Sequence, residues 1–258
     1  MKKIITVAAA LLAVVSLQAQ PQVIAHRGYH AKQGAARNTL AALENAQQLG
    51  VYGSECDVNL TSDGELVVIH GPWLGEKNAP DRLNVQKSDL ATLRSKKLEN
   101  GEVVPTLDEY LDQTAKDSNC KLIIEIKDHD TPQIETKVVK MVLDAVKRHK
   151  LQDRVEYIAF REHVCNELIR LAPAGTKVAY LNGTLKPKYL HAAGYTGLDY
   201  KLDVLKKNPK WIDEAHKLGL TVNVWTVNKT EDLKWVIDHN VDYITTDNPV
   251  EALSLIGR

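Results

Sequence analysis

Short β-branched segments alternate with helical segments about eight times along this chain, and this alternation constrains the fold more than any other feature. Strands separated by helices through short turns pair in parallel, with each helix crossing over the sheet. About eight such units fit a closed barrel, so we predict an α/β fold with a single (β/α)8 TIM barrel over residues 20–258. An open doubly wound sheet is the alternative, but no glycine-rich phosphate loop follows the first strand.

The predicted strands and helices follow each other in strict order. Strands are expected over residues 23–26, 53–60, 121–126, 155–159, 176–181, 197–200, 221–225 and 243–246. Helices are expected over 39–49, 106–117, 132–149, 162–171, 186–193, 209–218, 230–239 and 250–256, the first capped by Asn38 or Thr39. Residues 71–102 form a small irregular insertion after strand 2, with one short helix over 87–94.

The N-terminus has the layout of a cleavable signal peptide. Lys2 and Lys3 precede an apolar segment over 4–17, and Gln18-Ala19-Gln20 follows. The apolar segment is shorter than the roughly 18 to 20 residues of a membrane span. We therefore predict a signal peptide over 1–19, a protein secreted across the inner membrane without stable membrane insertion, and a periplasmic location if the source is a Gram-negative bacterium.

Charge argues against a nucleic-acid partner, and cysteine spacing argues against a zinc site. The chain has 33 basic and 33 acidic residues, and it lacks the basic surplus that nucleic-acid binding requires. We therefore expect no nucleic-acid partner. Cys56, Cys120 and Cys165 lack zinc-site spacing and are expected to pack in the core, although a single disulfide stays open.

Glu55 and Asp57 are the acidic residues that first point to a metal-binding site. Their i, i+2 spacing on a strand directs both carboxylates to one face, where they repel unless a cation lies between them. Taken alone, the pair could also be the solvated face of a surface strand. Glu125 lies near the end of the third strand, and active sites lie at the carboxyl ends of barrel strands. Three carboxylates favour Mg²⁺ or Ca²⁺ over zinc, although Glu125 could instead form a structural salt bridge with Lys127 or Arg27.

Histidines and cations follow the same strands. His26 ends the first strand and His70 follows the apolar segment 66–69, so we predict that they act as acid and base on a phosphodiester. Arg27 and Lys127 supply positive charge for phosphate oxygens. Trp225 is predicted to form an apolar wall for a glycerol or head-group skeleton, with barrel packing as the alternative.

Other polar residues near the strand ends are expected to contribute less. Asp247 either supports the site or belongs to a turn. Asp128-His129-Asp130 resembles a ligand cluster but is equally typical of an exposed loop, and we leave it out of the predicted site. Helix-end positions account for His149, His216 and His239. The remaining histidines, His30, His163 and His191, have no acidic or metal-like context in the sequence and are interpreted as loop or surface residues.

Together these residues resemble the glycerophosphodiester phosphodiesterase family over essentially the whole chain after residue 19. The resemblance rests on Ala25-His-Arg-Gly28, Asn38-Thr39, Glu55-Cys-Asp57, Thr61-Ser-Asp-Gly64 with His70, Pro105-Thr-Leu107, Ile124-Glu-Ile-Lys127, Val224-Trp-Thr-Val-Asn228 and Thr246-Asp247. It implies a TIM barrel, a divalent cation and hydrolysis of glycerophosphodiesters to an alcohol and glycerol 3-phosphate.

The resemblance also implies roles for individual residues. His26 and His70 would be the acid and base, Glu55, Asp57 and Glu125 the metal ligands, and Arg27 and Lys127 the phosphate contacts. In the related mechanism a glycerol hydroxyl attacks the phosphorus, and water opens the resulting cyclic phosphate.

Three departures from the family pattern stand out. Arg37 replaces an acidic residue, Gly71 replaces an aspartate after the second histidine, and residues 71–102 lack a large insertion. Two other functions stay open: phospholipase C- or D-like cleavage of intact lipids, and a non-catalytic barrel that binds phosphorylated ligands. The oligomeric state does not follow from the sequence.

Overall fold

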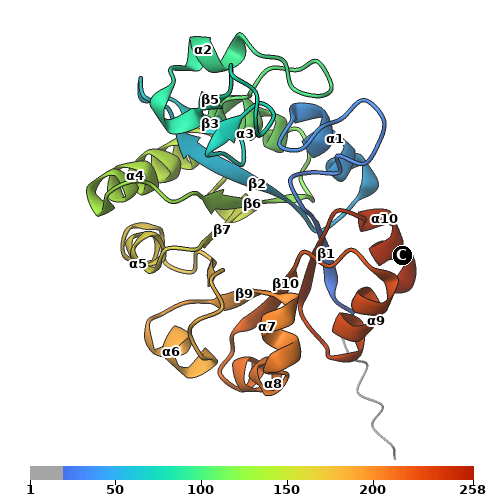
Figure 1. Ribbon diagram of the computed structural model, residues 1–258. Helices are drawn as coiled ribbons and strands as arrows, with labels where there is room; N and C mark the ends of the chain where they lie inside the picture. The colour runs from blue at the N-terminus through green and yellow to red at the C-terminus, as the bar shows by residue number, and fades with distance from the viewer. Residues whose placement is uncertain (1–19) are drawn as a thin grey trace, which may run out of the picture.

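Eight parallel strands close into a barrel in the computed structural model, which describes residues 20–258; the predicted signal peptide lies outside the described residues. The ring closes because β1 pairs with both β2 and β11, with Ala25 opposite Ser54 on one side and Thr246 on the other. The strands are β1 (Gln22–Ala25), β2 (Gly53–Leu60), β6 (Lys121–Ile126), β7 (Val155–Ala159), β8 (Val178–Tyr180), β9 (Gly197–Lys201), β10 (Thr221–Trp225) and β11 (Tyr243–Thr246). Helices surround this ring (Figure 1), which confirms the predicted (β/α)8 barrel.

The outer helices begin and end close to the predicted boundaries. They are α1 (Leu40–Leu49), α3 (Leu107–Ala115), α4 (Pro132–Arg148), α5 (Glu162–Leu171), α6 (Pro187–Ala192), α7 (Leu202–Lys207), α8 (Lys210–Lys217), α9 (Thr230–Asp238) and α10 (Pro249–Leu255). Thr39 caps α1 by accepting a hydrogen bond from the Ala42 amide at 3.1 Å. The prediction missed α7, because it continues β9 directly without a turn residue between them.

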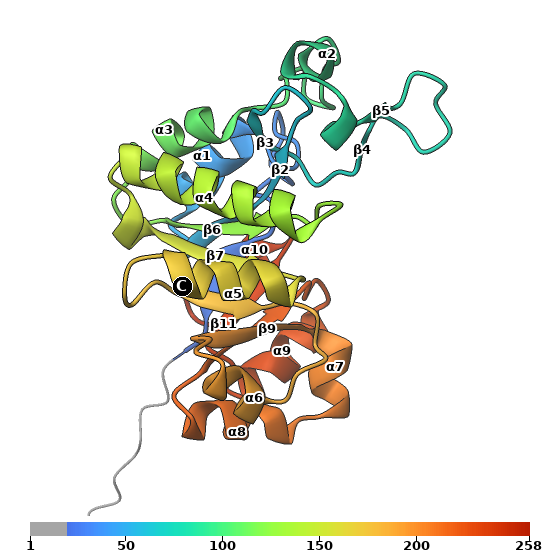
Figure 2. The same ribbon diagram turned by 90° about the vertical axis from the view of Figure 1, so that its left-hand side faces the viewer.

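The segment after β2 is more ordered than predicted. β3 (Leu66–Val68) pairs antiparallel with β2 outside the ring, and β4 (Trp73–Leu74) pairs with β5 (Leu83–Asn84). The predicted helix over 87–94 is a 3₁₀ turn (Val85–Lys87) followed by α2 (Leu90–Arg94), because Asp89 caps α2 and interrupts the helix. This segment stands out from the barrel in Figure 2.

Most of the apolar core lies between the ring and the helices, while a smaller cluster fills the barrel interior. Ile24, Ile123, Ile158 and Leu181 pack together inside the ring. The three cysteines are free and buried, as the packing interpretation predicts. Within residues 20–258, no helix combines the length and apolarity needed to cross a bilayer.

Candidate active site

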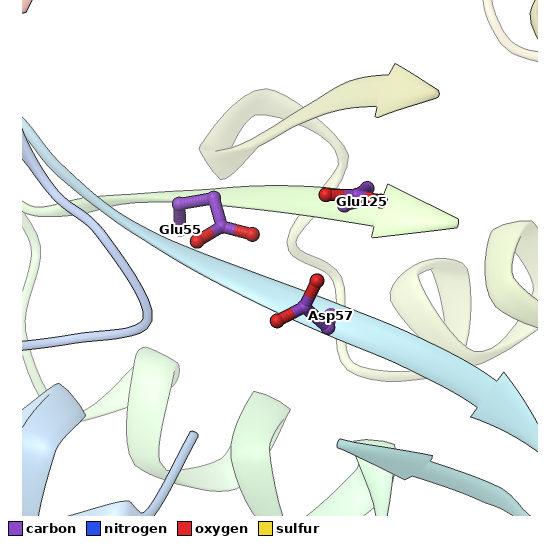
Figure 3. A group of neighbouring side chains, drawn as sticks. All are labelled: Glu55, Asp57 and Glu125. Carbon is purple, nitrogen blue, oxygen red and sulfur yellow. The ribbon is translucent and has the colours of Figure 1, made fainter. Parts of the chain in front are cut away.

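Three carboxylates converge at the end of two neighbouring strands. Glu55 and Asp57 lie on β2, and the register pairs Asp57 with Glu125 on β6. One oxygen from each residue lies within 4.8 Å of the others, and the residues are only 1 to 8% exposed. Figure 3 shows the three carboxylates gathered beside these two strands. The structure therefore brings together the three predicted metal ligands.

The charges around this carboxylate cluster are only partly balanced. Burial raises the pKa of Glu55 well above its usual value and that of Glu125 to about 7, and Asp57 adds to both shifts. Burial also acts to raise the pKa of Asp57, but Lys127 and Arg27 outweigh it and the net shift is downward. Lys127 Nζ lies 2.5 Å from Glu125 Oε1, so the alternative salt bridge of Glu125 is also present.

One oxygen of the cluster is unsatisfied. Oε1 of Glu55 is buried and has no hydrogen-bond partner among residues 20–258. A buried oxygen without a partner lowers the stability of the folded protein unless a ligand binds to it. Three hard oxygen donors with an unpartnered member fit a divalent cation such as Mg²⁺ or Ca²⁺.

The loop after β1 holds the cluster in place. Arg27 has a left-handed backbone (φ 55°), and its amide donates to Glu55 Oε2 at 2.8 Å. Gly28 follows with φ 79°, and a Cβ there would lie 2.6 Å from the Cβ of Ala42 in α1. The side chain of Asn38 forms two hydrogen bonds with Asp57. Its Nδ2 donates to Oδ2 of Asp57 at 2.8 Å, and its Oδ1 accepts from the backbone amide of Asp57 at 3.2 Å. These contacts give a physical role to the His-Arg-Gly and Asn-Thr segments.

His26 is oriented by the residue that follows the last strand. Its Nδ1 lies 2.8 Å from Oδ1 of Asp247, and a carboxylate accepts hydrogen bonds, so Nδ1 carries the proton. This leaves Nε2 free for proton exchange. Asp247 also accepts from Asn228 Nδ2 at 2.7 Å and from His30 Nε2 at 3.0 Å. Although burial opposes it, these hydrogen bonds hold the pKa of Asp247 well below its usual value.

His70 also lines the cavity, and its ring is held by the backbone. Its Nδ1 donates to the Gly71 carbonyl oxygen at 3.0 Å, which supplies an acceptor where the family resemblance expects an aspartate. Burial is the main reason why the pKa of His70 is lowered, and Lys127 and Arg27 add to it against the opposing charge of Asp57. A lowered pKa leaves the ring neutral near pH 7.

Two histidines lie elsewhere than the sequence interpretation placed them. His30 contacts Asp247 beside His26, because ring closure brings the end of β11 against the loop after β1; its interpretation as a residue without acidic neighbours was wrong. His129 is buried rather than exposed: its Nδ1 donates to the Lys127 carbonyl oxygen and its Nε2 accepts from the Leu60 amide. The contact of His30 could have been predicted from Asp247, an aspartate at the end of the last strand, and the loop after the first strand, which carries both His26 and His30.

A cavity of about 210 Å³ opens beside these groups. Every predicted site residue except Asp57 lines it, so His26, His70, Arg27, Lys127 and Trp225 face the space next to Glu55 and Glu125. The remaining wall was not predicted and consists of Ile158, Phe160, Leu181, Asp199 and Thr245. Trp225 packs edge-to-face against Phe160 with ring centroids 5.5 Å apart, which makes this wall partly aromatic.

Comparison with known proteins agrees with this geometry. Residues 26–251 match the model of the glycerophosphoryl diester phosphodiesterase family. The chain belongs to this family. A glycerophosphodiester phosphodiesterase from Caldanaerobacter subterraneus subsp. tengcongensis is 31% identical over 92% of this chain and 98% of its own length.

Solved structures of other proteins share the fold. A glycerophosphodiester phosphodiesterase from Parabacteroides distasonis is 42% identical, with a TM-score of 0.87 over 92% of this chain and 97% of the other. A phosphodiesterase from Oleispira antarctica, solved in complex with the product sn-glycerol-3-phosphate, is 23% identical and shares the fold, with a TM-score of 0.80 over 93% and 98% of the two chains.

Arg37 and Gly71, the two residues that depart from the pattern of the glycerophosphodiester phosphodiesterase family, lie in different surroundings. Arg37 is exposed next to Asn38, so its charge lies at the protein surface. Gly71 has φ 60°, and a Cβ there would lie 3.1 Å from the Asn59 side chain, so a larger residue would crowd Asn59.

Proposed function

We propose that this protein hydrolyses glycerophosphodiesters to an alcohol and glycerol 3-phosphate with the help of a divalent cation, Mg²⁺ or Ca²⁺. One observation carries the proposal: a buried cluster of three carboxylates and two cavity-lining histidines lie around one cavity in a member of this family. A small-molecule substrate suits a cavity of about 210 Å³.

Glu55, Asp57 and Glu125 would hold the cation. When bound, it would offset the charge that develops on the phosphate and favour ionisation of a substrate hydroxyl. Arg27 and Lys127 would contact the phosphate oxygens, Arg27 through its guanidinium and Lys127 as a point charge. Trp225 and Phe160 would pack against the carbon skeleton.

The two histidines would divide the proton transfers. His70 has a lowered pKa and begins neutral, so it would accept the proton of the attacking glycerol hydroxyl. His26 would begin as the imidazolium, with one proton on Nδ1 toward Asp247 and a second on Nε2. As the hydroxyl oxygen bonds to phosphorus and the bond from phosphorus to the oxygen of the departing alcohol breaks, the Nε2 proton of His26 would pass to that oxygen. Water then opens the cyclic phosphate, with each histidine reversing its role.

We also propose that residues 1–19 are a signal peptide and that the protein works outside the inner membrane. The lysine pair and apolar segment described above support this proposal. Cell fractionation with N-terminal sequencing tests it: a periplasmic protein that begins near Gln20 is expected, and a cytoplasmic protein that keeps residue 1 would contradict it.

An assay of glycerophosphocholine hydrolysis tests the proposed reaction. Glycerol 3-phosphate is detected with a coupled dehydrogenase, with Mg²⁺ and Ca²⁺ supplied separately. Turnover is expected to stop with EDTA and in His26→Ala, and hydrolysis that survives both would refute the assignment. Release of phosphocholine or choline from intact lipid vesicles, without turnover of the soluble diester, would favour lipid cleavage instead. A folded protein that binds glycerol 3-phosphate and hydrolyses no diester would favour the non-catalytic binder.

A further inference from the structure

Asp199 is a carboxylate of the cavity that the proposed reaction leaves without a role. It lies on β9, which is four strands away from β2 in both directions around the ring. Asp199 therefore belongs to the wall that faces the strand carrying Glu55 and Asp57 across the barrel. Its separation from the carboxylate cluster in the ring order argues against a place among the metal ligands.

The side chain of Asp199 is buried and incompletely paired. The residue is 1% exposed, and its Oδ1 has no hydrogen-bond partner among residues 20–258. Burial raises the pKa of Asp199 to about 8, and the charge of Glu125 adds to this shift against the opposing effect of the Asn223 side chain. An unsatisfied buried oxygen is retained at a cost of about 1–3 kcal/mol, which a function at the cavity would explain.

The surroundings of Asp199 identify the chemistry of its partner. Ile158, Leu181 and Trp225 give the cavity an apolar surface, and the cations that suit a phosphate, Arg27 and Lys127, lie just after the ends of β1 and β6. The phosphate would therefore bind near β1, β2 and β6, and an uncharged polar group would reach Asp199. The glycerol group offers hydroxyls in every glycerophosphodiester, whereas the alcohol on the other side of the phosphate varies.

We propose that Asp199 is a specificity-determining residue that hydrogen-bonds the terminal hydroxyl of the substrate's glycerol group. This inference rests on the proposed function. With the terminal hydroxyl held at β9, the central hydroxyl stays on the side of the carboxylate cluster. Its oxygen then bonds to phosphorus, its proton passes to a histidine, and the alcohol leaves with a proton from the other histidine.

Calorimetric binding of two ligands to the Mg²⁺-loaded protein tests this role. The ligands are glycerol 3-phosphate and 1,2-propanediol 1-phosphate, which differs from it only in lacking the terminal hydroxyl. At pH 7 the wild type is expected to bind glycerol 3-phosphate about 2- to 10-fold more tightly, as one hydrogen bond to a neutral, protonated carboxyl group allows. Asp199→Ala is expected to reduce this preference to near unity, while Asp203→Ala on the exposed side of α7 keeps it.

A merely structural role would weaken both ligands together and leave their ratio unchanged, and that result would overturn the proposal. Equal affinities in the wild type would overturn it without any variant, so a failure of Asp199→Ala to fold does not decide the matter. A third result would also overturn the proposal. If Asp199→Ala keeps the wild-type ratio of affinities for glycerol 3-phosphate and propanediol phosphate but changes the preference between diesters with ethanolamine and glycerol head groups, the partner of Asp199 is an ammonium group. Hydrolysis of glycerophosphocholine by the wild type is measured in parallel: its absence rejects the proposed function, whereas turnover without the expected ratio rejects only the role of Asp199.

Discussion

Asp247→Asn should slow catalysis by disturbing His26 while leaving the barrel intact. In the structure Asp247 accepts three side-chain hydrogen bonds, from His26 Nδ1, His30 Nε2 and Asn228 Nδ2, at 2.8, 3.0 and 2.7 Å. An asparagine has one acceptor oxygen in place of two, so its amide must face a donor on one side. Either the Asn228 contact is lost, or the two histidines are.

The magnitude follows from the charge that is lost. A hydrogen bond to a charged group contributes about 1.5–3 kcal/mol and a neutral one about 0.5–1.5 kcal/mol, so the His26 contact should weaken by about 1–2 kcal/mol. This energy stabilises the protonated His26 ring in its reactive orientation, so kcat should fall by about 5- to 30-fold. The assay is the coupled measurement of glycerol 3-phosphate from glycerophosphocholine, with circular dichroism as a check of folding.

Asp242→Asn is a matched control at the opposite end of the same strand. Asp242 directly precedes β11, and its Oδ2 contacts His216 Nε2 at 2.9 Å and the Val222 amide at 2.7 Å. This pair lies away from the cavity, so kcat should stay unchanged. A folded Asp247→Asn protein with a kcat within about twofold of the wild type would refute the positioning role of Asp247.

Further predictions concern the cation, its pH dependence and the stability of the barrel. Asn38→Ala removes both hydrogen bonds to Asp57, and affinity for Mn²⁺ measured by calorimetry should fall about 10- to 100-fold; unchanged affinity would show that Asp57 needs no such support. The pKa of Glu125 is raised from 4.5 to about 7 in the metal-free protein, so protons compete with the cation below pH 7, and affinity should increase as the pH rises toward 7. By the same shift, the folded metal-free state binds this proton more tightly than the unfolded state, so the stabilisation from Glu125 is present below pH 4.5 and is lost as the pH rises through 7; a melting temperature insensitive to pH in this range, with and without cation, would contradict it. Thr106→Ala removes the capping box of α3 and should lower the free energy of unfolding by about 0.5–2 kcal/mol in urea titrations while kcat stays the same.

The sequence predicts the barrel well because each strand and helix carries its own periodic pattern. β2, β6 and β11 begin and end at the predicted residues, since turn residues flank each strand. It predicts α7 poorly, because that helix follows β9 without a break. The 3₁₀ turn before α2 was also missed, since a capping aspartate inside a helical pattern gives only a weak stop.

The candidate site was predictable where residues lie on consecutive strand ends. Glu55, Asp57 and Glu125 follow from strand alternation and barrel order alone. His30 and Asp199 could not be found in this way. The contact of His30 with Asp247 depends on closure between the first and last strands. The role of Asp199 depends on which way β9 turns its side chains, and a strand of only five residues gives little pattern from which to decide.

Crystallography with Mn²⁺ tests the central claim most directly. The protein is crystallised with Mn²⁺, and an anomalous difference map locates the cation. The account predicts a peak in contact with a carboxylate oxygen of each of Glu55, Asp57 and Glu125, within the cavity lined by His26 and His70. A map without a peak at these carboxylates, in a protein that still hydrolyses glycerophosphocholine, would contradict it.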